Sequence, residues 1–237
     1  MEVHAHSHTE RKKFTHYFWE FLMLFLAVFC GFLAENIREQ RNNHEIEKRN
    51  VEIIIDNLKS DTAELSYVIN GNIVRSMRID SLVMQKQYNM SDTNVLKQVV
   101  NFYLNITTDY IFHSNDVALE QMKSSGSLRL VKSKQVLDSL FNYMHSNWLL
   151  NYDGEYYTRG SSNLFSVAAK LFDFVPLGKQ LSAPINLKQK GDLIQEFYNA
   201  AVSINYQIRV YYLKLLQEQR VHASNLIELL KKEYHLK

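Results

Sequence analysis

The side chains best suited to chemistry in this chain of 237 residues include a group of histidines near its N-terminus. His4, His6 and His8 alternate there, and imidazole groups at that spacing can bind Zn²⁺, Cu²⁺ or Ni²⁺. A flexible tail supplies no fixed partners to orient those imidazoles, so we interpret residues 1–13 as a solvated, basic, His-rich tail. We therefore expect no bound metal and no cofactor.

His113, Asp116 and Glu120 form a second compact group, in which the two carboxylates would share one helical face. Such a group could bind a metal or act in acid-base catalysis. We favour a helix N-terminus capped by Asn115 or Asp116, with a favourable acidic first turn. The sequence holds no catalytic, nucleotide-binding or metal-binding motif of higher specificity, so we expect a protein that is not an enzyme.

A third group is aromatic and could bind a ligand. It consists of Tyr143, Trp148, Tyr152, Tyr156 and Tyr157. Aromatic side chains at helical spacing more commonly form core, but the same residues could line a ligand pocket inside a helical bundle. Both interpretations are open at the level of sequence.

The elements that must position these groups begin with an apolar segment, Phe14 to Ala34, directly preceded by Arg11, Lys12 and Lys13. At about 1.5 Å per helical residue the segment reaches about 31 Å, close to the hydrocarbon thickness of a bilayer. We predict a transmembrane helix over residues 14–34. The three basic residues, with Tyr17 and Trp19, would lie at the membrane interface.

A cleavable signal peptide is the alternative, because the uncharged stretch Phe21 to Ala34 has only fourteen residues. The exit sequence Cys30 to Glu35 offers no pattern of small residues for cleavage, which favours an anchor. Basic residues flank both ends of the segment, with Arg38, Arg41, Lys48 and Arg49 on the far side. The N-terminal group is compact and adjoins the apolar run, so we predict that the N-terminus is cytoplasmic.

Glu20 is an unexpected residue in such a helix, since a carboxylate in hydrocarbon is costly. Tyr17 and Trp19 could mark the headgroup region, which would let Glu20 reach water. Alternatively, Glu20, Ala27 and Ala34 lie seven residues apart on one stripe, with Gly31 beside them. Small residues let two helices approach closely, so this face could pair with a second copy or with another membrane protein.

Composition favours helices for the remaining residues, 35–237. Seven glycines and two prolines are few for this length. The net charge of +2 gives no large positive field, so we expect no nucleic-acid partner. The only cysteine is Cys30, which rules out an intramolecular disulfide.

Apolar periodicity and turn signals divide residues 35–237 into helices. The predicted core positions of the first helix are Val51, Ile54, Ile55, Leu58, Leu65 and Ile69. We predict a long helix at about 35–88, short helices near 94–106, 115–124, 133–151 and 157–174, and a long helix at about 187–234. The predicted breaks include Ser124 to Ser127 and Asp153-Gly154. The last long helix should place Ile204, Ile208, Tyr211 and Leu215 in the core. The predicted fold is all-α, a transmembrane helix continuing into an antiparallel bundle with two long helices.

The stretches Asp56 to Leu65 and Asn115 to Lys132, behind an aromatic anchor, resemble a family of single-pass membrane proteins from Bacteroidota that has no established activity. The likeness covers residues 14–145, and its most specific part is Met122 to Val131. The resemblance implies an anchored helical domain in a Gram-negative envelope, which would be an inner-membrane protein with a periplasmic domain.

These observations predict a non-enzymatic, membrane-anchored helical protein that scaffolds or regulates an envelope partner. The partners would be the lipid bilayer and either further copies of the chain or another membrane protein. The alternative is a single-pass ligand sensor that uses the aromatic group as its pocket.

Overall fold

The computed structural model describes residues 14–178, 184–188 and 191–236. The chain divides into two compact units, residues 1–49 and 50–237. The first described helix, α1 (Phe14–Met84), contributes residues to both. The protein is all-α, as predicted, with one very short pair of strands.

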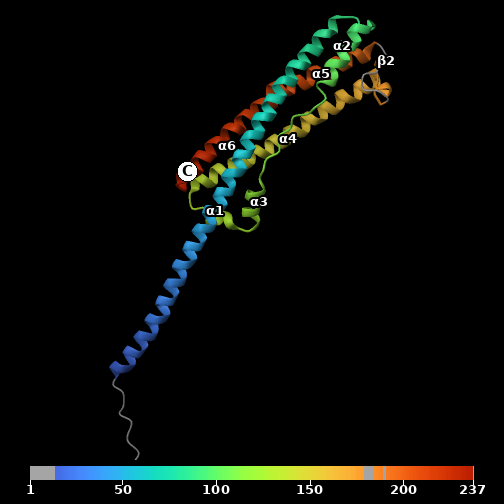
Figure 1. Cartoon of the computed structure of the whole chain (residues 1–237). Coiled ribbons are helices and arrows are strands. Elements are labelled where there is room, and N and C mark those ends of the chain that lie inside the picture. Colours follow the sequence, from blue (N-terminus) through green and yellow to red (C-terminus); the bar gives the residue numbers. More distant parts are fainter. Residues whose placement is uncertain (1–13, 179–183, 189–190, 237) are drawn as a thin grey trace, which may run out of the picture. The chain divides into compact units, whose positions relative to one another are not determined.

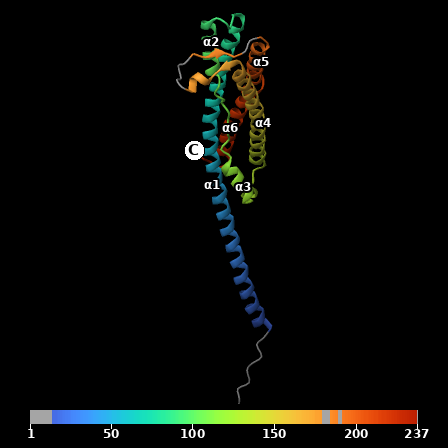
Figure 2. The ribbon, with the colours of Figure 1, turned by 90° about the vertical axis from the view of Figure 1, so that its right-hand side faces the viewer.

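The elements after α1 form the second unit. They are the 3₁₀ turn η1 (Gln85–Gln87), α2 (Thr93–Leu104), α3 (Val117–Ser124), the 3₁₀ turn η2 (Ser127–Leu130), α4 (Lys134–Leu171), β1 (Phe172–Asp173), the 3₁₀ turn η3 (Val175–Gly178), β2 (Asn186–Leu187), α5 (Asp192–Gln207), the π-helical turn η4 (Ile208–Tyr212) and α6 (Leu213–Glu233). Within this unit α4 packs along both α5 and α6, and the figures show these helices side by side (Figure 1, Figure 2).

Local sequence explains several helix ends. The Asp92 carboxylate caps α2 by accepting hydrogen bonds from the backbone N–H groups of Asn94 and Val95, at 2.7 and 3.4 Å. Gly126 follows α3 in the left-handed conformation, with φ of 71°, which glycine adopts at little cost. The predicted break at residues 124–127 is therefore confirmed.

The first and last helical segments of the unit run antiparallel and share its core. Val51 to Leu58 of α1 cluster with Ala223 to Leu230 of α6, in a smaller core cluster. Leu65 to Leu82 cluster with Phe197 to Leu216, in a larger one. Lower-numbered residues of α1 cluster with higher-numbered residues of the C-terminal segment, so the two helical segments run in opposite directions.

The predicted break at Asp153-Gly154 is wrong, because α4 is one helix of 38 residues. Gly154 is buried, and a Cβ atom there would lie 3.4 Å from the Ile111 side chain and 3.7 Å from the Tyr212 hydroxyl. The glycine therefore allows close packing and does not end the helix. The helices predicted near 133–151 and 157–174 are therefore one helix, whereas those predicted near 94–106 and 115–124 correspond to the short helices α2 and α3.

Two other helix boundaries differ from prediction. The helix expected from residue 115 begins at Val117, and the side chain of its N-cap residue Asp116 makes no capping hydrogen bond. The long helix expected from residue 187 begins at Asp192, because Asn186 and Leu187 pair antiparallel with Phe172 and Asp173.

The π-helical turn corrects the predicted core face of the last helix. Tyr211 and Leu215 were expected inside, but Tyr211 is exposed and Leu215 is half-buried, whereas Tyr212 and Leu216 are buried. A π-helical turn adds one residue to the helical repeat, so the core positions directly after it move by one. The sequence pattern, read with a constant period, could not include that shift.

Candidate functional site

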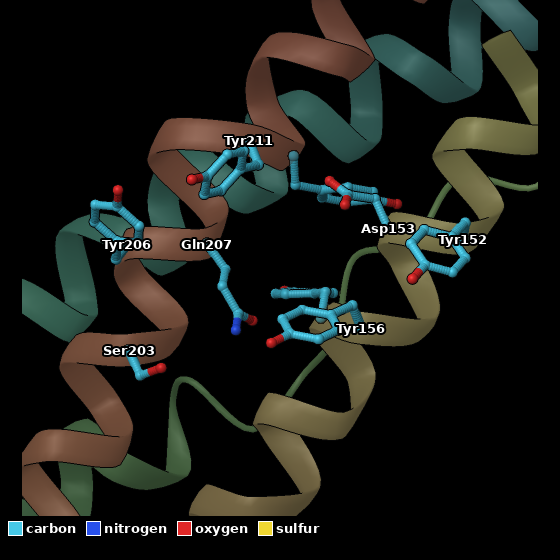
Figure 3. Close-up of a pocket in the computed structure, with 9 residues that line it drawn as sticks. Tyr152, Asp153, Tyr156, Ser203, Tyr206, Gln207 and Tyr211 are labelled. Atoms are coloured by element: carbon cyan, nitrogen blue, oxygen red, sulfur yellow. The ribbon is translucent and has the colours of Figure 1, made fainter.

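One cavity of the second unit lies between α4 and the segment formed by α5 and η4 (Figure 3). Its volume is about 430 Å³, which is within the usual range for small-molecule sites. Six tyrosines line it, together with Asp153, Ser203 and Gln207. The tyrosines are Tyr152, Tyr156, Tyr157, Tyr206, Tyr211 and Tyr212.

Two of these tyrosines form the floor of the cavity. Tyr157 and Tyr212 are each 1% exposed, and their rings stack with centroids 5.3 Å apart. The Tyr212 hydroxyl accepts a hydrogen bond from the backbone N–H of Phe112 at 3.1 Å. Burial raises the pKa of Tyr212 to about 12, so its phenol is neutral at physiological pH. The floor is thus rigid and uncharged.

A buried arginine, Arg75, hydrogen-bonds to Tyr157 of the floor. The Arg75 guanidinium donates to the Ile106 carbonyl at 2.8 Å, to Asp109 at 2.7 Å, to Ser161 at 3.1 Å and to the Tyr157 hydroxyl. It also lies 5.0 Å from the centroid of the Tyr157 ring. Burial raises the pKa of Tyr157, while the Arg75 charge acts in the opposite direction. Because Asp109 neutralises Arg75, this network brings no net charge to the floor.

The other four tyrosines form the rim of the cavity, where water reaches them. They are 52% to 63% exposed: Tyr152, Tyr156, Tyr206 and Tyr211. Tyr206 and Tyr211 meet edge to face at 5.8 Å, on the α5 side. Tyr152 stacks on Trp148 at 6.0 Å, on the α4 side. The rim therefore places aromatic rings on both sides of the opening (Figure 3).

Three polar groups lie between floor and rim. Asp153 is half-buried, and this burial raises the pKa of its carboxyl. The Gln207 side-chain oxygen is buried and has no hydrogen-bond partner within residues 14–178, 184–188 and 191–236. A Cβ atom at Gly160 would lie 3.0 Å from that oxygen, so the glycine makes room for it. Ser203 adds an exposed hydroxyl.

The π-helical turn builds one side of this site. Tyr211 and Tyr212 both belong to it, and they take different positions, one on the rim and one on the floor. In a regular α-helix two adjacent residues are 100° apart, and a π turn changes which of them faces the neighbouring helix. Such turns occur often at functional sites.

The structure brings only part of the predicted aromatic group together. Tyr152, Tyr156 and Tyr157 line the cavity, but Tyr143 and Trp148 do not. Tyr143 is buried in another layer, where its hydroxyl donates to Asp61 at 2.5 Å. Trp148 is exposed and stacks with His145 at 6.0 Å. The five predicted residues therefore do not share one cavity, and Tyr143 lines a separate one with His145 and His222.

Sequence reasoning missed the α5 side of the cavity. The signal available there was the tyrosine-rich stretch Tyr206 to Tyr212, of which we assigned only Ile208 and Tyr211 to the core face of a long helix. Asp153 was missed because Asp153-Gly154 was interpreted as a turn. Both omissions concern residues whose role depends on contacts with a distant part of the chain.

The predicted membrane segment is described from Phe14 onward, and it is helical throughout. Its side chains are exposed apart from Leu22, although most are apolar. Among the described residues, α1 is the one helix long and apolar enough to cross a membrane. Tyr17 and Trp19 are exposed on it. Arg11, Lys12 and Lys13, as well as His4, His6 and His8, lie outside the described residues.

The four residues of the proposed pairing stripe, Glu20, Ala27, Gly31 and Ala34, are all exposed in the same segment. His16 Nε2 lies 3.1 Å from Glu20 Oε1, one turn away on the same helix. A Cβ atom at Gly31 would meet nothing within 4 Å. The stripe is therefore open, and Glu20 has a partner within its own helix.

In the described part of the chain, no cluster of three or more His, Cys, Asp or Glu side chains could hold a metal ion. This includes His113, Asp116 and Glu120. The backbone N–H of His113 instead bonds the Glu64 carboxylate at 3.3 Å. Comparison with protein-family models, with curated proteins and with solved structures finds no match to this chain.

Proposed function

We propose that this protein is a non-enzymatic, single-pass protein of the inner membrane whose helical domain scaffolds or regulates an envelope partner. Residues 14–34 would cross the bilayer, with the N-terminus in the cytoplasm and residues 50–237 in the periplasm. The observation that carries the proposal is the surface of residues 14–34, which is apolar and almost entirely exposed. In water such a surface is unfavourable, and in lipid it is favourable.

The orientation rests on the basic residues. Arg11, Lys12 and Lys13 are adjacent and directly precede the apolar segment, whereas the basic residues on the other side are spread from Arg38 to Arg49. Basic residues close to the end of a membrane helix favour the cytoplasmic side.

The buried charged groups of the second unit support a structural role. Asp61 accepts from Tyr143 and from the backbone N–H of Asn115 at 2.8 Å. Arg75 pairs with Asp109. Each of these groups holds separate segments together, and buried charges bonded in this way are structural more often than catalytic.

The stripe of Glu20, Ala27, Gly31 and Ala34 supports self-association in the membrane. Small residues lower the distance of closest approach between two helices, and dispersion contacts and hydrogen bonds then stabilise the pair. A second copy would carry an identical stripe, so the two stripes would pack against each other in a symmetric dimer.

Cross-linking in intact membranes tests this proposal, with the full-length protein and its Gly31→Leu variant. We expect a cross-linked dimer, or a complex with another membrane protein, that is reduced at least about tenfold by Gly31→Leu, which corresponds to about 1.4 kcal/mol of association energy. Phe29→Leu is the matched control, because Phe29 lies on the opposite side of the helix. A monomer in the wild type, or equal loss in both variants, would contradict the pairing.

The tyrosine-lined cavity favours a second function, the sensing of a small ligand. A ligand that binds the folded state raises the melting temperature, and about 2.7 kcal/mol is gained at a hundredfold excess over Kd. A screen of small molecules against the full-length protein would therefore detect it. No shift with any compound, together with a stable co-purifying protein, would favour the scaffold over the sensor.

A further inference from the structure

The charged side chain that lines the tyrosine-lined cavity is negative. None of its nine lining residues, all within the described part of the chain, is Lys, Arg or His, whereas Asp153 is a carboxylate. Arg75 lies behind the floor and is paired with Asp109 at 2.7 Å. Arg209, on the neighbouring η4 turn, is paired with Asp80 and hydrogen-bonded to Ser76 at 2.6 Å. Both of these arginines are therefore paired with carboxylates outside the cavity lining.

The aromatic rings add to this preference. Each ring carries partial negative charge on its face, which attracts a cation placed over it, more strongly when water is excluded. The four rim tyrosines lie on two helices that flank the opening, so a ligand inside would have rings on two sides. Several rings and one carboxylate form the arrangement that binds quaternary ammonium groups.

From this geometry we propose that the cavity between α4 and the α5–η4 segment binds small organic cations of the alkylammonium class. Tyr156 and Tyr206 contact the cationic group from opposite walls, and Asp153 balances its charge. Gln207 also lines the cavity, and its side-chain oxygen is buried close to Gly160. This inference rests on the second function given above, ligand sensing.

The electrostatics of the tyrosines agree with this assignment. Burial is the main cause of the raised pKa of Tyr212, and the charge of Asp153 adds to it. The pKa of Tyr211 is raised chiefly by its hydrogen bond with Tyr206, again with a contribution from Asp153. Burial disfavours a charge of either sign, so it is the contribution of Asp153 that favours cations over anionic ligands in this cavity.

Isothermal titration of the full-length protein in maltoside micelles tests the proposal with two probes of nearly equal shape. Choline carries a trimethylammonium group, and 3,3-dimethylbutan-1-ol replaces it with a neutral tert-butyl group. We expect choline to bind at least about tenfold more tightly than the neutral isostere, because only choline gains the cation–π and carboxylate terms. Equal affinity for both, or no heat with choline up to about 10 mM, where binding would be worth less than about 3 kcal/mol, would overturn the proposal.

Two pairs of variants locate the binding. Asp153→Asn should weaken choline about tenfold, whereas Glu155→Gln, which removes a neighbouring exposed carboxylate outside the cavity, should not. Tyr156→Leu removes a ring face and should weaken choline to a similar extent, whereas Tyr156→Phe keeps the face and should bind as the wild type does. Tyr206→Leu repeats the test from the opposite wall. Unchanged affinity in Asp153→Asn and in both leucine variants would also overturn the proposal.

The same titration separates the sources of the ligand. Glycerophosphocholine carries the lipid headgroup without acyl chains, so it adds a phosphate to the same trimethylammonium group. Tighter binding of glycerophosphocholine than of choline identifies a headgroup as the natural ligand; weaker binding identifies a free cation. If choline fails and another compound raises the melting temperature, ligand sensing stands and the cation class is wrong.

Discussion

Helix α1 contains two regions that share one continuous helical backbone and differ in how their apolar side chains are distributed around the helix. Residues 14–34 expose apolar side chains on every side, whereas residues 51–82 bury one face, with Val51, Leu65 and Ile79 each 0% exposed. An exposed apolar surface suits lipid and a one-sided apolar surface suits a bundle in water. Under the proposed function, the change of pattern along one helix corresponds to a change of solvent from lipid to water.

The polar side chains of the two regions differ in the same way. In the first, Glu20 meets His16 on its own helix. In the second, Ser76 donates to Asn205 at 2.6 Å, 129 positions away, and Arg75 bonds to four other segments or side chains. The described partner of Glu20 is thus one turn away on its own helix, whereas the polar groups of the second region join segments that are distant in sequence. The following changes should affect one region and leave the other intact.

The largest effect is expected from deleting residues 1–34. This deletion removes the apolar segment, which gains about 0.3–0.6 kcal/mol for each large aliphatic or Phe residue on insertion. The protein should move from the carbonate-resistant membrane pellet to the soluble fraction. Its melting temperature should stay within about 2 °C of the full-length value, since the bundle core is unchanged. Deleting residues 1–13 alone should leave it in the pellet. A shortened protein that still pellets would show that the bundle itself binds the membrane.

Arg75→Met should have the next largest effect, and only on the bundle. It removes one partner of a buried ion pair together with the bonds to Ile106, Tyr157 and Ser161. The expected loss is about 3–5 kcal/mol in the free energy of unfolding, measured in urea. Arg78→Met is the matched control, because Arg78 is exposed and donates to a single carbonyl, of Asn105; it should cost less than about 1 kcal/mol. Equal losses would mean that the Arg75 network adds no stability.

Tyr143→Phe tests the second polar layer of the bundle. The substitution keeps the buried ring and removes the hydroxyl that donates to Asp61, which is 1% exposed. The expected loss is about 1–3 kcal/mol, because a buried carboxylate then lacks a donor. Urea unfolding measures it, and Tyr67→Phe, at an exposed tyrosine, serves as the control. No loss would indicate that water reaches Asp61.

The smallest effect is the pH dependence contributed by Asp61. Burial raises the pKa of its carboxyl above 3.8, against the lowering effect of the hydrogen bond from Tyr143. The folded state then holds this proton more tightly than the unfolded state does. The resulting stability is present in full below the unfolded pKa and is lost as pH rises through the folded pKa. Asp61→Asn should remove that loss, so its stability relative to wild type should increase with pH across this range. A constant difference would mean that the pKa is not raised.

How far the sequence predicts this structure depends on how local each feature is. The six core positions predicted on the first helix, from Val51 to Ile69, are all buried, because one helix of constant period determines them. The continuity of α4 through Gly154 depends on packing against Ile111 and Tyr212, which the local sequence does not contain. The sequence predicted part of the α4 side of the cavity, from Tyr152, Tyr156 and Tyr157. Its other half needed the π-helical turn and the pairing of α4 with α5, and neither has a local signal.

The most direct test of the central idea, that residues 14–34 lie within lipid, uses the single cysteine of the chain, Cys30. The measurement is its labelling by a membrane-impermeant maleimide in opened membranes, before and after denaturation in SDS. A Ser91→Cys protein in a Cys30→Ala background controls for reagent access on both sides, since Ser91 is exposed in the loop before α2. We predict that Cys30 is unlabelled until SDS is added, while residue 91 reacts at once. Labelling of Cys30 as fast as the control, or no labelling even in SDS because the segment has been cleaved away, would contradict the account.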